Sequence, residues 1–331
     1  MSATVPAMKT IFMCSGQGSQ YYQMGRELFL QHADFRRCMQ EMDRVAVELC
    51  GNSVLRDLYD PARSKADWFD ELALTSPAIF MVEFALGSLL MQAGTVPDCI
   101  LGSSLGVFAA AALGGCLQRD EALRAVLKQS EIIQRECQKG GMVSILGDAA
   151  LIERPPLSGL CELAALNFPN HFTVAGPIAH LERIERHLSA VGLTFQRLAV
   201  NYAFHSKWIE AAGQPLEAGL RSVQPRAARI PLACCVGART IHELPQGYFW
   251  SVARQPIRLC DTIRTLEKDG PHRYIDVGPA GSLATMVKYA LAPGSRSSVH
   301  AAMSPYASDL RTLQTLQRNI AAQERVHAAL T

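Results

Sequence analysis

The sequence has 331 residues, of which 49% are hydrophobic and 19% charged, enough for one large domain or two unequal ones. Its formal net charge of +2 is too small to indicate nucleic-acid binding or a polybasic membrane anchor. The ten cysteines lack Cys-x-x-Cys spacing and lie mostly in apolar segments, which predicts buried free thiols in a reducing compartment. The first twenty residues carry one charge, Lys9, and no apolar stretch of signal-peptide length, so we expect a cytoplasmic protein.

The N-terminal part of the sequence begins with a short β-type run at residues 10–14, followed by Ser-Gly-Gln-Gly-Ser-Gln at residues 15–20. The two glycines around Gln17 predict a tight loop whose backbone N–H groups can point into a cleft, although an ordinary strand-to-helix turn fits the pattern equally well. Residues 21–49 have a mostly helical pattern. Ser76 and Pro77 predict the start of the next helix, with proline in its first turn, and Gly94 predicts its end.

A Gly-x-Ser-x-Gly pentapeptide occupies residues 102–106, between an apolar run that ends at Leu101 and a small-residue apolar run that begins at Val107. This order predicts a strand, a sharp turn and a helix, with the hydroxyl of Ser104 exposed at the turn. The helix start would offer unpaired N–H groups to a developing oxyanion. Residues 99–118 are uncharged and about as long as a membrane span, but their glycines and central serines favour a buried strand and helix.

The second half of the sequence begins with a helix over residues 121–137, which we expect Asp120 to cap, with Gln129 beside its apolar face. From about residue 140 the pattern becomes β-α-β-β-α-β, which predicts a small α+β subdomain inserted into the larger one. The remaining predicted elements are a helix at 208–223, a strand at 230–235, a helix at 258–268, a strand at 273–277 and a polar-faced helix at 309–330.

Several of these segments together resemble the malonyl-CoA:acyl carrier protein transacylases and the acyltransferase domains of polyketide synthases. The motifs that match, in the family's order, are Gly16–Gln20, the Gly-x-Ser-x-Gly pentapeptide, Ala203–Ser206, Gln255-Pro256 and Asp276–Pro279. The resemblance implies an α/β fold with a large α/β-hydrolase-like subdomain, residues 1–138 and 206–331. It also implies an inserted ferredoxin-like α+β subdomain, residues 139–205, with the active site between the two.

The same resemblance implies catalytic roles for particular residues. Ser104 would be the nucleophile and His205 its general base, because a serine hydroxyl needs a positioned imidazole to take its proton. The backbone carbonyl of Gln255 would orient the imidazole, and the backbone N–H groups of Gln17 and Leu105 would form the oxyanion hole. No metal site is implied.

Near the implied site the sequence departs from the family pattern. Ser103 stands where the family usually has histidine, Val107 where it has glutamate, and Ser76 where it has glutamine. The resemblance places Asn167 among the polar residues that line the cleft, although a turn asparagine is an alternative interpretation. It places Phe204 beside the substrate, where the side chain would set the size of the pocket.

The most informative departure lies in the helix after the pentapeptide. Malonyl-specific members have an arginine there, five residues before a glutamine, and its guanidinium binds the free carboxylate of malonate. When the helix is aligned on Gln134, the arginine position is occupied by Gln129, which has no charge. We therefore expect malonyl to be a poor substrate and Gln129 to contact the acyl group. A one-residue shift of the alignment would place Lys128 there instead.

The residues and the resemblance together leave three functions open. The first is an acyl hydrolase that acts in trans, removing non-carboxylated acyl groups from acyl carrier proteins of a polyketide synthase through a seryl acyl-enzyme. The second is an acyl-CoA or malonyl-CoA:acyl carrier protein transacylase. The third is a non-catalytic binding protein, which the presence of both Ser104 and His205 disfavours. We expect a monomer without membrane or nucleic-acid partners and without a bound cofactor, because the phosphopantetheine arm belongs to the carrier protein.

Overall fold

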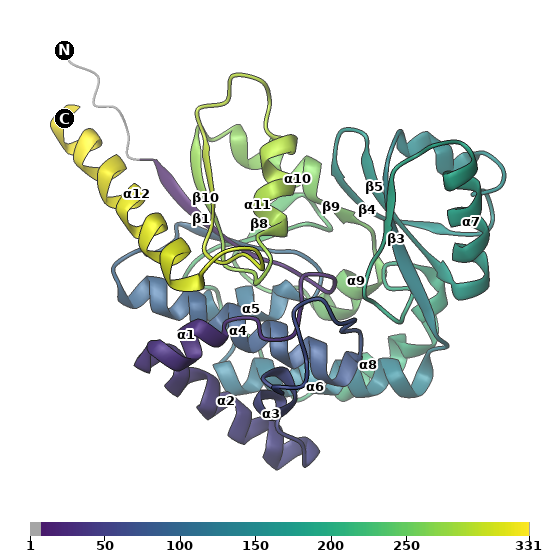
Figure 1. The fold of residues 1–331 in the computed structure, drawn as a ribbon, viewed down its shortest axis with the longest axis horizontal. Coiled ribbons are helices and arrows are strands. Elements are labelled where there is room, and N and C mark those ends of the chain that lie inside the picture. The colour runs from purple at the N-terminus through teal and green to yellow at the C-terminus, as the bar shows by residue number, and fades with distance from the viewer. Residues whose placement is uncertain (1–7, 331) are drawn as a thin grey trace.

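The computed structural model describes residues 8–330 and has the predicted α/β architecture, with two sheets side by side (Figure 1). Residues 1–7 and 331, which the sequence analysis assigned to the large subdomain, lie outside the described residues. The larger sheet has the order β11-β10-β1-β2-β7-β8, and its strand pairs are parallel except β7–β8. Its strands are β1 Lys9–Cys14, β2 Cys99–Gly102, β7 Leu232–Cys234, β8 Arg239–Ile241, β10 His272–Asp276 and β11 Ser298–Ala301.

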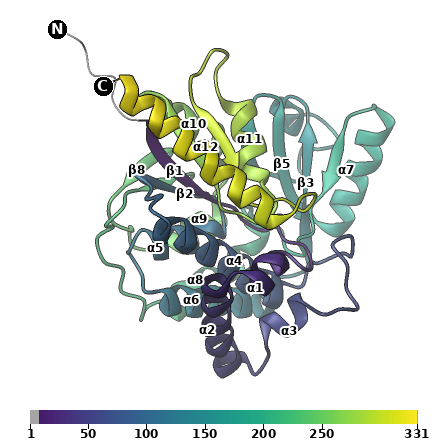
Figure 2. The same cartoon turned by 60° about the vertical axis from the view of Figure 1, so that its left-hand side comes forward.

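Helices cover both faces of this sheet, which explains why its central strand reads as a continuous apolar run. Because successive side chains of a strand point to opposite faces, Phe12 and Cys14 of β1 join the core shared with α4, α5 and α6, whereas Ile11 and Met13 join the core shared with α10 and α11. The helices of the large subdomain are α1 Arg26–Gln31, α2 Ala33–Cys50, α3 Val54–Leu58, α4 Leu72–Gln92, α5 Gly106–Leu113, α6 Arg119–Glu136, α8 Gly213–Gly219, α9 Tyr248–Arg254, α10 Leu259–Glu267, α11 Ser282–Ala290 and α12 Asp309–Leu330. The last of these packs beside β11 and α1 (Figure 2).

Two predicted helix starts are wrong. Helix α4 begins at Leu72 rather than at Ser76, and Pro77 lies inside it, because buried side chains from Leu72 onward extend the helix by a turn before the proline. Helix α6 begins at Arg119, and its N-cap is Gln118 rather than Asp120. The Gln118 N–H donates to the Glu121 carboxylate at 2.9 Å, which satisfies a terminal amide in the manner of a capping box.

The predicted helix over residues 208–223 is also divided in the structure. A 3-10 helix, η2, covers Lys207–Ala212, and α8 follows from Gly213. The break coincides with close packing: a Cβ on Gly213 would lie 3.0 Å from the ring of Trp250. The segment between the buried His205 and α8 therefore turns tightly against α9.

The smaller sheet has the order β6-β3-β5-β4-β9 (Figure 1). Its first four strands pair antiparallel in the arrangement of a ferredoxin-like β-α-β-β-α-β unit, with the short 3-10 helix η1 in place of the first predicted helix. The fifth strand, β9, comes from the large subdomain and pairs in parallel with β4. The elements are β3 Gly140–Leu146, η1 Ala149–Glu153, β4 Glu162–Phe168, β5 His171–Pro177, α7 Ile178–Ala190, β6 Phe195–Arg197 and β9 Ile257–Arg258.

Helix α4 is long and apolar enough to cross a membrane by length and composition, with a mean hydropathy of 1.6 over its most apolar window. In the structure 78% of that window is buried, and the helix packs against α2, α3, α5 and α6. The apolar character of α4 is therefore that of a core helix. The uncharged segment 99–118 likewise folds into β2 and the buried helix α5.

Candidate active site

Ser104 lies at the sharp turn between β2 and α5. Its φ of 54° is in the left-handed region, which a non-glycine residue adopts at a cost when the surrounding structure imposes it. The flanking glycines explain how the turn fits: a Cβ on Gly102 would lie 2.6 Å from the Cα of Val107, and one on Gly106 would lie 2.2 Å from the carbonyl oxygen of Cys14. The pentapeptide thus presents the Ser104 hydroxyl at the carboxyl end of the central strands.

His205 faces this hydroxyl. The Ser104 Oγ lies 2.8 Å from the His205 Nε2, and the His205 Nδ1 lies 2.8 Å from the backbone oxygen of Gln255. Because a carbonyl oxygen can only accept, the ring proton sits on Nδ1 and leaves the Nε2 lone pair for the serine proton. The backbone of His205 is held as well, since its N–H donates to the Ala253 oxygen at 2.8 Å.

The protonation state of His205 suits a general base. Burial lowers the pKa of His205 from 6.5 to about 4, and hydrogen bonds to backbone carbonyls of Gln255 and Val252 act in the opposite direction. The imidazole is therefore neutral at pH 7 and able to accept a proton.

The loop of residues 15–20 packs directly against the serine turn. A Cβ on Gly16 would lie 2.8 Å from the Ser104 Cβ, so the contact requires glycine. Within residues 8–330 the structure shows no hydrogen-bond partner for the backbone N–H of Gln17 or of Leu105, the two donors predicted for the oxyanion hole. Their amides are thus available to an oxyanion formed at Ser104.

Sequence reasoning missed the group that holds this loop in place, Glu83 of α4. The Glu83 Oε1 accepts from the Ser15 N–H at 2.6 Å and hydrogen-bonds to the Ser15 hydroxyl at 2.7 Å, and the Ser19 hydroxyl donates to the Gly16 oxygen at 2.8 Å. Glu83 is fully buried, and burial raises the pKa of its carboxyl well above the usual value. A single acidic residue inside the apolar run AIFMVEFAL was the available signal.

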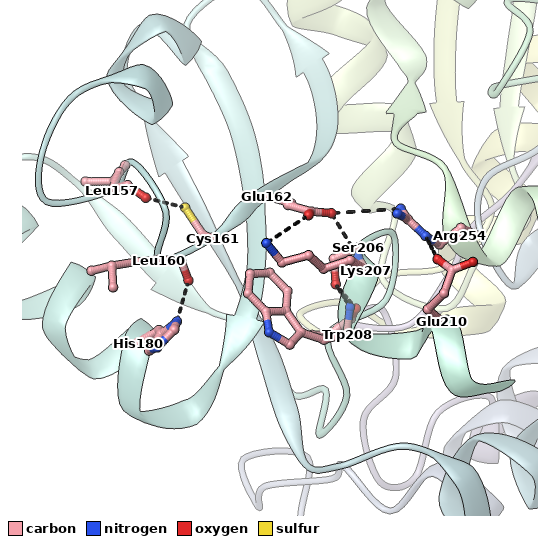
Figure 3. A network of polar contacts seen from close by, with 11 residues as sticks. Leu157, Leu160, Cys161, Glu162, His180, Ser206, Lys207, Trp208, Glu210 and Arg254 are labelled. Carbon is pink, nitrogen blue, oxygen red and sulfur yellow. Dashed lines mark hydrogen bonds and ion pairs between the residues drawn. The ribbon is translucent and has the colours of Figure 1, made fainter.

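Glu162 of β4 ties together the two segments that carry His205 and Gln255 (Figure 3). Its carboxylate accepts from the Lys207 N–H at 2.8 Å and pairs with the Lys207 and Arg254 side chains at 3.6 and 3.8 Å. Lys207 follows His205 by two residues, and Arg254 precedes Gln255. The small subdomain therefore helps to fix the imidazole and the carbonyl that orients it.

Beside Ser104 lies a narrow inner pocket with a cavity volume of about 10 Å³, roughly the space of one water molecule. Gln129 of α6 lines it and is 6% exposed. Of the described residues, none with a charged side chain lines this pocket. Its lining consists of Gln17, Ser76, Ser104, Leu105, Val107, Phe108, Gln129, Phe204, Phe249, Val252 and Ala253.

Ser104 also lines an outer cleft of about 100 Å³ between the two subdomains. Ser103, Asn167, Phe204 and His205 line it, so Phe204 borders both spaces. Asn167 lies within strand β4 and its Nδ2 is 3.0 Å from the His171 Nδ1, which excludes the alternative of a turn asparagine. The predicted site residues therefore line two neighbouring spaces that share Gln17, Ser104 and Phe204, except Gln255, whose backbone oxygen orients His205.

Lys128 does not reach this cavity. Its side chain is 42% exposed and its Nζ lies 2.9 Å from Glu131 on the outer face of α6. Of these two side chains, it is therefore Gln129 that lines the pocket beside Ser104.

A serine hydroxyl activated by a neutral imidazole, between an uncharged inner pocket and an open cleft, defines a serine-dependent acyltransferase or acyl hydrolase. Residues 11–329 match the acyl transferase domain family, to which this chain belongs.

Two relatives extend over nearly the whole chain. The sequence is 39% identical over 311 residues to the polyketide biosynthesis acyltransferase homolog BaeD of Bacillus velezensis, covering 94% of this chain and 96% of the relative. It is 37% identical over 308 residues to the homolog PksD of Bacillus subtilis, covering 93% and 95%. Among solved structures, the acyl transferase domain of SpnD in complex with 2-(pent-4-yn-1-yl)malonyl aligns with a TM-score of 0.83 and 27% identity, over 92% of this chain and 74% of that one.

Proposed function

We propose that this protein is an acyl hydrolase that acts in trans and removes non-carboxylated acyl groups from acyl carrier proteins of a polyketide synthase. The observation that carries the proposal is the neutral Gln129 in an inner pocket whose described lining has no charge. A malonyl carboxylate in this pocket would lose its hydration without gaining a counter-ion, at a cost on the order of several kcal/mol. The polyketide context is supported by the names of BaeD and PksD, which match the chain nearly end to end.

In the first half-reaction the carrier protein's phosphopantetheine arm lies in the outer cleft and the acyl group enters the inner pocket. The Ser104 Oγ attacks the thioester carbon while the His205 Nε2 takes its proton, and the backbone N–H groups of Gln17 and Leu105 bind the oxyanion. The tetrahedral intermediate then collapses, the carbon–sulfur bond breaks, and the thiolate takes the proton from His205. Each oxyanion donor contributes about 3 kcal/mol to transition-state stabilisation.

In the second half-reaction water takes the place of the departed thiol. His205 removes a proton from the water as its oxygen attacks the acyl-enzyme, and the same proton is returned to the Ser104 Oγ when the acid leaves. The second candidate function, transacylation, uses the same acyl-enzyme with a second carrier-protein thiol in place of water. The description of the relatives as acyltransferase homologs favours keeping it as the alternative.

The remaining properties proposed for the protein follow from this mechanism. Its partner is an acyl carrier protein and its substrate an acyl thioester, and it needs no bound cofactor because the reactive thioester is supplied by the partner. We further propose that it works as a cytoplasmic monomer.

A panel of acetyl, propionyl, butyryl and malonyl carrier proteins tests the proposal by comparing release of free acid with transfer to a second carrier protein. Release of the neutral acids, with malonyl at least about tenfold slower in kcat/KM, is the expected result. Fast loading from malonyl thioesters would refute it, and transfer faster than release would favour the transacylase. Intact mass of the wild type and of Ser104→Ala separates both from a non-catalytic protein, because only the wild type should gain an acyl group.

A further inference from the structure

Four short contacts connect the buried carboxyl of Glu83 to the loop that carries a predicted oxyanion donor. The Glu83 Oε1 lies 2.6 Å from the Ser15 nitrogen and 2.7 Å from the Ser15 Oγ. The Ser15 Oγ lies 2.9 Å from the Ser19 Oγ, which lies 2.8 Å from the Gly16 oxygen. Three of these contacts join two oxygen atoms at the distance of an O–H···O hydrogen bond, so each of the three needs a proton.

A count of these protons gives the charge state of Glu83. The hydroxyls of Ser15 and Ser19 supply two protons and a backbone carbonyl supplies none, so the third must come from the carboxyl. With an ionised carboxyl, the two serines would donate to Glu83 and Gly16, and their own oxygens would face each other at 2.9 Å without a proton. A protonated carboxyl removes this conflict. Glu83 then donates to Ser15 and Ser15 to Ser19, whose hydroxyl donates to the Gly16 oxygen.

The surroundings of Glu83 also favour the neutral carboxyl. The side chain is fully buried, and its Oε2 has no hydrogen-bond partner in the part of the chain that the structure describes. Burial raises the pKa of this carboxyl well above its usual value, and the charge of Asp276 on β10 raises it further. The other titratable group facing it is the Cys14 thiol on β1, whose pKa the Glu83 charge would raise. Both neighbours are acids, so neither would stabilise a carboxylate.

The chain of hydrogen bonds ends on the peptide group that contains the oxyanion donor. The Gly16 carbonyl and the Gln17 N–H belong to the same resonant peptide unit, so a hydrogen bond to the oxygen makes the N–H a stronger donor. The Ser19 N–H also approaches the Gly16 oxygen, but at 3.3 Å. The Ser19 hydroxyl at 2.8 Å is therefore the stronger of the two contacts. In such a chain each bond strengthens the next, by roughly 10–30% per bond.

We propose that Glu83 is a neutral carboxylic acid at pH 7 and a positioning residue for the oxyanion hole. Its proton begins a chain through Ser15 and Ser19 that fixes and polarises the peptide between Gly16 and Gln17. The inference rests on the proposed acyl-enzyme chemistry. It applies to release and to transfer alike, because both pass through an oxyanion at the same serine.

Infrared difference spectroscopy of the whole protein tests the charge state without a substrate. At about pH 8.5, ordinary glutamates are ionised, as is Asp276, whose pKa burial raises to about 7. The spectrum of wild type minus Glu83→Gln should then contain the C=O stretching band of a buried carboxylic acid. The same band should shift in Ser19→Ala, because the shortened chain weakens the hydrogen bond that Glu83 donates. A carboxylate band in its place would overturn the inference.

Single-turnover acylation by a butyryl carrier protein, followed by intact mass, tests the effect on the reaction. Glutamine at position 83 keeps the shape of glutamate, but one amide atom cannot both accept from the Ser15 N–H and donate to the Ser15 Oγ. Ser19→Ala removes the last hydroxyl of the chain. Ser130→Ala is the matched control, because it removes a buried hydroxyl that is hydrogen-bonded within α6.

We expect the acylation rate at saturating substrate to fall at least about tenfold in Glu83→Gln and in Ser19→Ala, with half-saturation nearly unchanged. The oxyanion forms only as the thioester is attacked, so substrate binding should not be affected. Ser130→Ala should stay within about twofold of the wild type, and the double variant should be little slower than the slower single variant. Equal rates for Ser19→Ala and Ser130→Ala would overturn the inference, whether or not Glu83→Gln folds.

The outcomes distinguish this inference from the proposed function. If the wild type is acylated and releases the acid but shows no carboxylic acid band that depends on Glu83, the inference fails and the proposed function stands. If the wild type forms no acyl-enzyme with any thioester, the proposed function fails, and the catalytic role of the chain fails with it even where the band is present.

Discussion

The burial of His205 predicts how the stability of the folded protein changes with pH. Burial lowers the pKa of His205 to about 4 in the folded protein, against about 6.5 for an unfolded chain. The folded state thus binds fewer protons than the unfolded state between these values, and the stability attributable to His205 is complete above pH 6.5. It is lost as pH falls from 6.5 to 4, by about 3 kcal/mol in total, and then levels off.

Other buried groups change the pH dependence of stability in the opposite direction, so the measurement must isolate the contribution of His205. Burial raises the pKa of Asp276 from 3.8 to about 7, and a carboxyl whose pKa is raised loses stability as pH rises through this range. Glu83 acts in the same direction. The difference in unfolding free energy between wild type and His205→Gln cancels both, because the two proteins share these carboxyls.

Urea denaturation of both proteins between pH 4 and 7.5 gives this difference at each pH. We expect the unfolding free energy of the wild type, measured relative to that of His205→Gln, to fall by about 3 kcal/mol from pH 7 to pH 4. In parallel, the rate of Ser104 acylation should stay level well below pH 6.5, since the imidazole remains neutral. A stability difference independent of pH, together with an acylation rate that halves near pH 6.5, would refute the geometry described for the buried pair.

Three further predictions concern the pocket and the oxyanion loop. Replacing Gln129 by arginine should raise kcat/KM for malonyl relative to acetyl thioesters by roughly tenfold or more, as a counter-charge replaces an amide; an unchanged ratio would count against its position in the acyl pocket. Phe249→Ala should increase hydrolysis of octanoyl thioesters, because this ring also borders the large groove behind the pocket, and chain-length profiles that match the wild type would contradict this. Gly16→Ala should lower kcat by about 100-fold, because the added methyl group would press against the Ser104 side chain. The control Gly237→Ala should retain activity, because its added methyl group meets only a flexible side chain. Equal rates for both variants would refute the argument.

The parts of the site that sequence could predict are those encoded locally. The strand, glycine-flanked turn and helix around Ser104 depend on residues within one short stretch. The pattern around Gln17 fits an ordinary turn equally well, and the roles of Gln17, His205 and Gln255 follow only from the family resemblance. The start of α4 was misplaced because a proline is a strong local signal, whereas the burial of Leu72 is a tertiary effect. Glu83 was missed for the same kind of reason, since nothing near it in sequence shows that Ser15 will be its partner.

Most residues that depart from the family pattern lie far apart in the sequence but close together in the fold. Ser76, Val107 and Gln129 come from three successive helices, α4, α5 and α6, yet all three line the inner pocket. The hydrogen-bonded pair of Ser104 and His205 retains the geometry needed for acyl transfer.

A protein that had lost catalysis would have no reason to keep a strained serine backbone and a buried neutral imidazole, each of which costs stability. Three of the four side chains that differ line the inner pocket that would receive the acyl group, and the fourth, Ser103, lines the outer cleft. The departures from the family thus lie among residues that would contact the substrate, whereas Ser104 and His205 are retained. This argues for a working enzyme that accepts a different acyl group, and against a binding protein that has lost catalysis.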